Sequence, residues 1–148
     1  MTAPTLPLLL ARLASLATKH GLLVSNLDDV DLALLMHSAT SPLSQSEVYS
    51  EASVNRTLKH WLANEGGMLR TDHVELRRTL IDLQFLVRDG FGRAYTRPAA
   101  APARFREVLE TLGDSDLAAV ALEARESFER QRAARRLAHS KSAVPTKG

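Results

Sequence analysis

The sequence contains no cysteine, few aromatic residues and no long apolar run. Without cysteine there can be no disulfide bond, thiolate metal site or cysteine nucleophile, which suits a reducing cytoplasm. Because only 5% of the residues are aromatic, leucine, valine and alanine must fill most of the core. No stretch approaches the ~18 apolar residues of a membrane span, and the N-terminal apolar run has no basic start and is broken by Arg12. These features predict a soluble, cytoplasmic protein without a signal peptide.

Patterns that carry catalysis or metal binding are also missing. The histidines form no His-x-His or His-x₃-His pair and lack the nearby carboxylates of a metal site. There is no phosphate-binding glycine loop and no nucleophile elbow. We therefore expect a protein that is not an enzyme and that uses no metal or cofactor.

The 148 residues are 45% apolar and 24% charged, which is enough to build one folded domain with appended helices. The net charge is only +2, but it is unevenly spread. Residues 1–50 hold two basic and four acidic side chains, whereas residues 51–97 hold eight basic and six acidic ones. Residues 98–148 hold nine basic and seven acidic side chains. Such a mildly basic rear part permits contact with nucleic acid without requiring it.

Apolar residues recur at helical spacing along most of the chain, which predicts a mainly α fold. The expected helices are 4–20, a segment with its body at 30–36, a segment from Ser50 to the break at 64–67, then 72–84, 103–112 and 115–138. Asn26 and the acidic residues after it are expected to cap the second helix, and Ser50 the third. The body at 30–36 is apolar nearly all round, which favours central burial. Thr71 or Asp72 is the expected cap of the helix over 72–84.

Residues 85–97 alternate around a glycine-containing turn, which is typical of a two-stranded β-hairpin. Three helices followed by a hairpin form the order of a winged-helix domain. In that arrangement 72–84 is the recognition helix and 85–97 is the wing. We predict a winged-helix-like domain with an N-terminal helical extension over 1–98, a C-terminal helical extension over 99–139 and a disordered tail over 140–148.

Several motifs resemble those of a bacterial family known as domain of unknown function 2087. They are "YSEASVN" (49–55), "DHVELRRTLID" (72–82), "LVRD" (86–89) and the Tyr95-x-Arg97 pair, so the resemblance covers about 42–98. Members are often joined to DNA-binding domains of transcription regulators, which implies a regulatory role but assigns no activity. Gln84 departs from the pattern, because the family usually has a helix-ending glycine there.

Five residues are candidates for DNA contact: Arg78, Thr79, Arg88, Arg93 and Arg97. On the expected recognition helix, Arg78 and Thr79 would approach a groove, while the three hairpin arginines would hold phosphates. The alternatives are that Arg78 pairs with Asp82 on the helix surface and that the hairpin arginines only keep an edge strand soluble.

Arg77 lies on the flank of the apolar helix face, where a guanidinium is expected to be paired internally. Glu51 and Asn55, at the head of the preceding helix, are its expected partners. Together they would form a structural polar clamp between two helices.

These features favour a bacterial DNA-binding protein, a transcriptional regulator that reads DNA with 72–84 and the wing. The terminal helices, 4–20 and 115–138, would build a homodimer, because many compact DNA readers use two-fold symmetry. The alternative is a non-catalytic protein–protein interaction module on the same scaffold.

Overall fold

A computed structural model describes residues 4–91 and 93–143 of the chain, and the side chains of those residues up to 140. The helices and strands, in chain order, are α1 (Leu6–Ala17), η1 (Val24–Asn26), α2 (Asp29–Thr40), β1 (Val48–Ser50), α3 (Glu51–Ala63), α4 (His73–Asp82), β2 (Val87–Arg88), β3 (Ala94–Thr96), η2 (Ala103–Phe105), α5 (Arg106–Leu112) and α6 (Leu117–Ala143). The mainly α fold with a small β-hairpin, expected from the sequence, is confirmed.

Short polar side chains cap the N-termini of three helices, α2, α3 and α4. Asp28, Ser50 and Asp72 each accept a hydrogen bond from the backbone N–H three residues further on, at α2, α3 and α4 respectively. Of the residues expected to cap α2, the acidic Asp28 is the cap, whereas Asn26 is not, because residues 24–26 form the separate 3₁₀ turn η1 and α2 starts after it.

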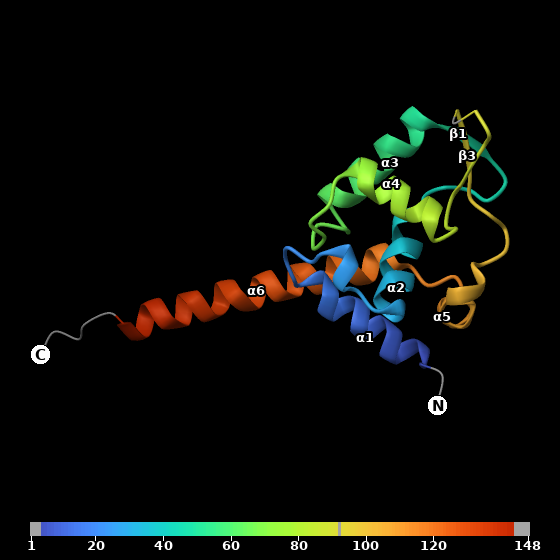
Figure 1. The fold of residues 1–148 in the computed structure, drawn as a ribbon. Coiled ribbons are helices and arrows are strands. Elements are labelled where there is room, and N and C mark those ends of the chain that lie inside the picture. The colour runs from blue at the N-terminus through green and yellow to red at the C-terminus, as the bar shows by residue number, and fades with distance from the viewer. Residues whose placement is uncertain (1–3, 92, 144–148) are drawn as a thin grey trace, which may run out of the picture.

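Helix α2 lies at the centre of the molecule, with the other helices around it (Figure 1). Its apolar residues 32–36 are buried, as the all-round apolar pattern predicted. Trp61 of α3 is also buried, and its indole N–H donates a 2.9 Å hydrogen bond to the hydroxyl of Ser38 on α2. Gly66 packs directly against that ring, and any larger residue at this position would collide with Trp61.

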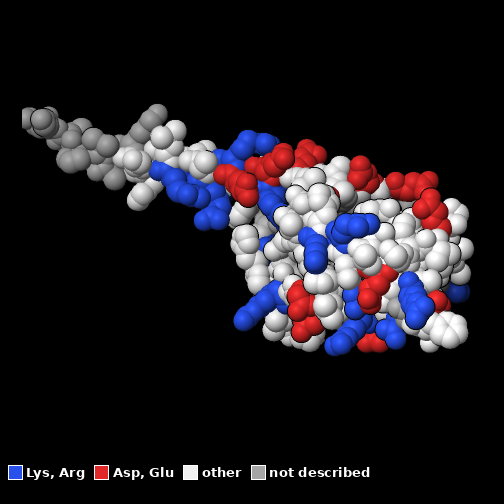
Figure 2. Space-filling view, turned by 90° about the horizontal axis from the view of Figure 1, so that it is seen from above, with Lys and Arg blue, Asp and Glu red and all other residues white. Residues whose placement is uncertain are grey.

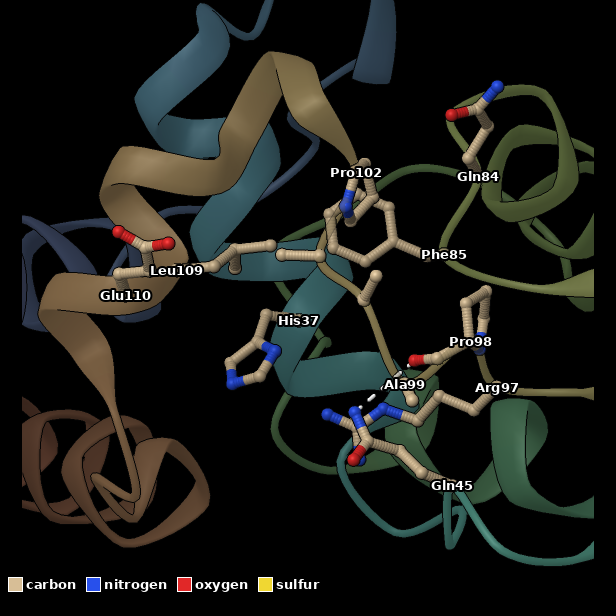
Figure 3. Close-up of a pocket in the computed structure, with 12 residues that line it drawn as sticks. His37, Gln45, Gln84, Phe85, Arg97, Pro98, Ala99, Pro102, Leu109 and Glu110 are labelled. Carbon is tan, nitrogen blue, oxygen red and sulfur yellow. Dashed lines mark hydrogen bonds between the residues drawn. The ribbon is translucent and has the colours of Figure 1, made fainter.

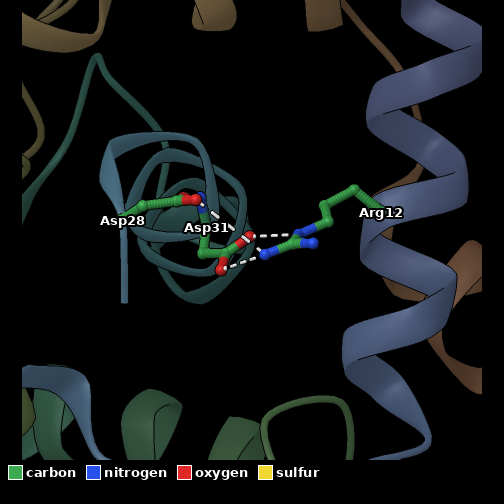
Figure 4. Close-up of polar contacts among 3 residues, drawn as sticks. All are labelled: Arg12, Asp28 and Asp31. Carbon is green, nitrogen blue, oxygen red and sulfur yellow. Dashed lines mark hydrogen bonds and ion pairs between the residues drawn. The ribbon is translucent and has the colours of Figure 1, made fainter. Parts of the chain in front are cut away.

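The N-terminal and C-terminal helices pack on one another within the same chain. Helix α1 lies against the first part of α6, and the rest of α6 projects away from the body (Figure 1). Arg12 of α1 binds Asp31 of α2 through two hydrogen bonds of 2.7 and 2.9 Å (Figure 4). This bidentate contact raises the pKa of Arg12 and satisfies a carboxylate that is buried.

The three strands form one antiparallel sheet in the order β1-β3-β2. Strand β1 was not expected from the sequence, since its three residues directly precede the capped start of α3. The two hairpin strands, β2 and β3, are also shorter than the alternating pattern over 85–97 predicted. In the central register Tyr95 pairs with Tyr49 on one side and with Arg88 on the other. Tyr95 is fully buried, so this face of the sheet is turned toward the helices, while Arg88 on the edge strand stays exposed.

Helix α4 ends in a tight turn that sends the chain into β2. Gln84 has φ 68°, the left-handed conformation, and the backbone N–H of Phe85 donates a 2.8 Å hydrogen bond to the carbonyl of Leu80. A glycine adopts this conformation without the steric cost that a Cβ atom carries. Gln84 is therefore strained at the position where the resembled family usually has glycine.

The C-terminal extension covers α2 and α1. Helix α5 packs on α2, and the ring of Phe105 contacts Phe85 with 5.4 Å between ring centroids. Helix α6 continues to Ala143, so residues 140–143 of the expected tail are helical; 144–148 lie outside the described residues. Among the described residues, no helix has the length and apolar character needed to cross a bilayer.

Replacing Gln84 by glycine removes the left-handed strain, so Gln84→Gly raises the free energy of unfolding by about 1 kcal/mol. Gln84→Ala is the matched control, because it shortens the side chain but keeps the Cβ atom, and it leaves stability nearly unchanged. Urea unfolding followed by circular dichroism measures both. Equal stability of the glycine and alanine variants would contradict this explanation of the turn.

Candidate nucleic-acid interface

Arg77 joins three elements at the base of α4. Its guanidinium donates a hydrogen bond to the side-chain oxygen of Asn55, and its second terminal nitrogen lies 3.3 Å from a carboxylate oxygen of Glu51. The hydroxyl of Tyr95 donates a 3.0 Å hydrogen bond to the same carboxylate oxygen. We call Glu51, Asn55, Arg77 and Tyr95 the polar clamp. It links α3, α4 and β3 around the Arg77 side chain, which is only 13% exposed.

Arg78 follows directly, and the 100° step of an α-helix turns it away from the clamp. Its side chain is exposed, and within the described residues it makes no hydrogen bond or ion pair. Asp82 lies one turn further on, yet no ion pair joins it to Arg78 in the part of the chain described. The surface pair considered as an alternative is therefore absent from this structure.

An open depression of about 470 Å³ separates the end of α4 from β2. It is lined by Arg78, Ile81, Asp82, Gln84, Leu86, Val87 and Arg88. Arg78 comes from the helix and Arg88 from the edge strand, so two arginines from different elements line one hollow. Its single carboxylate, on Asp82, leaves an excess of positive charge there. We call this depression the α4–β2 groove.

Two of the other candidates lie apart from the α4–β2 groove. Thr79 donates a 3.0 Å hydrogen bond from its hydroxyl to the backbone carbonyl of Glu75, and it lines a second depression beside Arg70. Arg93 lies in the hairpin turn, where its side chain is exposed and its backbone N–H donates to the carboxylate of Asp89 at 2.9 Å.

Arg97 turns inward. Its guanidinium is half-buried and donates a 3.1 Å hydrogen bond to the carbonyl of Leu43. Burial lowers the pKa of Arg97, because the charge has lost part of its hydration. The structure therefore brings Arg78 and Arg88 together, places Arg93 at the hairpin tip and separates Arg97 from all three.

Basic and acidic side chains are interspersed over the surface. On the face shown in Figure 2, blue and red groups alternate over the body and do not form one continuous field of either sign. A polyanion would therefore meet a local cluster of arginines and would experience little long-range attraction.

Sequence reasoning did not include Tyr95 in the polar clamp, or the apolar lining of the α4–β2 groove. Tyr95 carried a usable signal, because a tyrosine in an alternating strand offers a buried ring and a hydroxyl that seeks a partner. No sequence pattern predicts the groove, because its shape depends on the angle between α4 and β2 that the turn at Gln84 sets. Among the described residues, no group of three or more histidines or carboxylates could hold a metal ion.

Arg77 and its neighbour Arg78 provide a matched pair of substitutions. Arg77→Ala leaves Asn55 and Glu51 without the guanidinium they share, and it lowers the free energy of unfolding by about 2 kcal/mol. Arg78→Ala removes the same side chain from an exposed site and changes stability by less than about 0.5 kcal/mol. Urea denaturation of the two variants tests the clamp, and similar losses in both would contradict it.

The model of one protein family matches residues 27–97, and its description is "Uncharacterized protein conserved in bacteria", domain of unknown function 2087. The resemblance inferred over 42–98 is confirmed, and the match also takes in α2. No curated protein and no solved structure matches the chain.

Proposed function

Since residues 27–97 carry the domain of this bacterial family, we propose that the protein is a DNA-binding transcriptional regulator of the winged-helix type. Helix α4 is the reading helix and the β2–β3 hairpin is the wing. In this proposal the protein works in the cytoplasm, catalyses no reaction and needs no cofactor.

The order of the elements supports this proposal. The family match contains helix, strand, helix, helix and then two strands, and its sheet has the order β1-β3-β2. In winged-helix domains the same order presents the third helix and the following hairpin on one side. Helix α4 and β2 border one groove here, as such an arrangement requires.

The observation that carries the proposal is that Arg78 and Arg88 line the same groove and that no carboxylate in the described part of the chain pairs with either of them. A guanidinium with free N–H groups binds a phosphate, or the acceptor edge of a guanine, through two hydrogen bonds. Arg93 extends the positive charge to the tip of the wing. Thr79 lies at the other flank of α4, where its hydroxyl can approach the backbone of the DNA.

Two carboxylates on α4 limit the affinity of this surface for DNA. Glu75 and Asp82 are exposed on α4, and they repel phosphates and the acceptor-rich edges of guanine. Binding therefore depends on a few phosphate contacts and falls steeply as salt is raised. Sequence choice rests on Arg78, with Asp82 able to accept from the amino group of a cytosine.

Removing Arg78, Arg88 and Arg93 together tests the interface. The wild-type protein binds duplex DNA with log Kobs falling linearly against log salt concentration, and the triple alanine variant reduces that slope by about 2–3. Fluorescence anisotropy with a pool of mixed duplexes, repeated at several salt concentrations, measures both.

The control removes the same number of charges elsewhere. Lys19, Arg104 and Arg106 are exposed, and none of them lines the α4–β2 groove. Their triple alanine variant keeps the wild-type slope. A wild-type protein without measurable DNA binding at low salt, or equal losses in the two triple variants, would contradict the proposed interface.

The proposal includes a homodimer. Because α1 packs on the first part of α6 within one chain, the projecting part of α6 is the surface left for a second copy. Leu137 is 58% exposed on that part. An isolated helical segment is marginally stable in water, so a paired helix would stabilise it.

Multi-angle light scattering tests this pairing and gives the mass of two chains for the wild type at micromolar concentration. Leu137→Arg shifts the mass to that of one chain. Leu8→Arg is the control, because Leu8 is 65% exposed on α1, outside the proposed contact. A wild-type protein with the mass of one chain would contradict the dimer.

A second candidate function is that of a protein-interaction module. Val48 and Val87 both pair with Thr96, so the three side chains form one row on the face of the sheet opposite Tyr95. The valines are 68% and 49% exposed, which makes this row an apolar strip on the surface. This candidate is favoured if the wild-type protein does not bind DNA.

A further inference from the structure

Another cavity lies where residues 27–97 meet the C-terminal extension, and it shares Gln84 of its lining with the α4–β2 groove (Figure 3). Its volume is about 170 Å³. The lining residues are His37, Gln45, Gln84, Phe85, Arg97, Pro98, Ala99, Ala100, Ala101, Pro102, Leu109 and Glu110. They come from α2, the loop before β1, the turn after α4, the end of β3, the linker and α5.

Arg97 supplies a positive charge that the protein does not neutralise. Its guanidinium makes one hydrogen bond, to the carbonyl of Leu43, in the part of the chain described. No carboxylate among those residues lies within ion-pair distance of it. A guanidinium has five N–H donors, and a half-buried one is costly to leave without a counter-charge. An anion placed in the cavity would supply that charge.

His37 faces the same cavity from the last turn of α2 (Figure 3). Burial lowers the pKa of His37, and the nearby charge of Arg97 lowers it further. Both effects favour the neutral imidazole, which can donate one hydrogen bond and accept another. The cavity thus offers one cation, with His37, Gln45 and Gln84 as neutral polar groups, which suits a single negative charge better than a doubly charged phosphate.

The rest of the wall is mostly apolar. Phe85, Leu109 and Pro102 lie on one side of the space and the alanine-rich linker closes another (Figure 3). A volume of 170 Å³ is close to the ~150 Å³ of an engineered protein cavity that holds a benzene ring. Glu110 lies at the end opposite Arg97, so it would repel a second acidic group on a ligand.

We propose that this cavity binds a small organic monocarboxylate with a ring-sized apolar body. The carboxylate accepts hydrogen bonds from Arg97, and the body packs against Phe85 and Leu109. A neutral His37 contributes a further hydrogen bond near the carboxylate. This site does not depend on whether the α4–β2 groove binds DNA.

Isothermal titration calorimetry with benzoate and 3-methylbutanoate tests the site on the full chain. At least one probe binds with 1:1 stoichiometry and a Kd on the order of 1 mM or below. Benzamide, which has the same ring but no charge, binds at least about tenfold more weakly. Absence of saturable binding for both carboxylates, or equal binding of benzamide and benzoate, overturns the proposal.

Arg97→Gln tests the role of the guanidinium and weakens carboxylate binding by about tenfold or more. Arg104→Gln is the charge-matched control, because Arg104 lies on the neighbouring η2, does not line the cavity and pairs with Asp29. The Arg104→Gln variant binds the carboxylate probe with the affinity of the wild type. Wild-type affinity in a folded Arg97→Gln variant overturns the assignment.

Leu109→Trp gives an independent test if Arg97→Gln fails to fold. It fills the apolar end of the cavity and leaves Arg97 and its bond to Leu43 in place. Circular dichroism confirms that the variant is folded, and carboxylate binding is then lost. Binding as tight as that of the wild type would place the ligand elsewhere and overturn the proposal.

Discussion

The contact of Arg77 with Asn55 and Glu51 fixes how α4 sits on the rest of the domain. The hydrogen bond from Tyr95 to the same Glu51 carboxylate extends the contact to the sheet. Helix α4 is short, and its apolar contacts alone would allow it to rotate on α3. A guanidinium that binds two side chains of α3, one of them also bonded to β3, permits fewer orientations. With Arg77 directed inward, Arg78 is directed outward, and the α4–β2 groove takes its shape from that arrangement.

Most helices, and the caps at Ser50 and Asp72, were predicted from the sequence, because apolar spacing and short polar caps are local features. The sheet was harder to predict. Strand β1 has three residues, and long-range pairing with β3 defines it. The position of Arg97 could have been derived from the alternation of a strand. Residues two apart share a face, so a buried Tyr95 directs Arg97 toward the protein as well. Arg93 has the same parity, but it lies beyond the end of β3, in the turn.

The proposed interface and the carboxylate cavity meet at the turn after α4. Gln84 lines both, and Phe85 lines the cavity while packing on Phe105 of the C-terminal extension. Helix α4 and the C-terminal extension are therefore connected through this turn.

The central claim is that outward-facing arginines of α4 and the hairpin form the nucleic-acid surface, whereas their inward-facing neighbours hold the fold. NMR spectra of the arginine Nε–Hε groups, recorded as duplex DNA is added, test it most directly. The account predicts large shifts for Arg78, Arg88 and Arg93 and small ones for Arg77 and Arg97. Shifts confined to the arginines of α6, or no shifts at low salt, would contradict it.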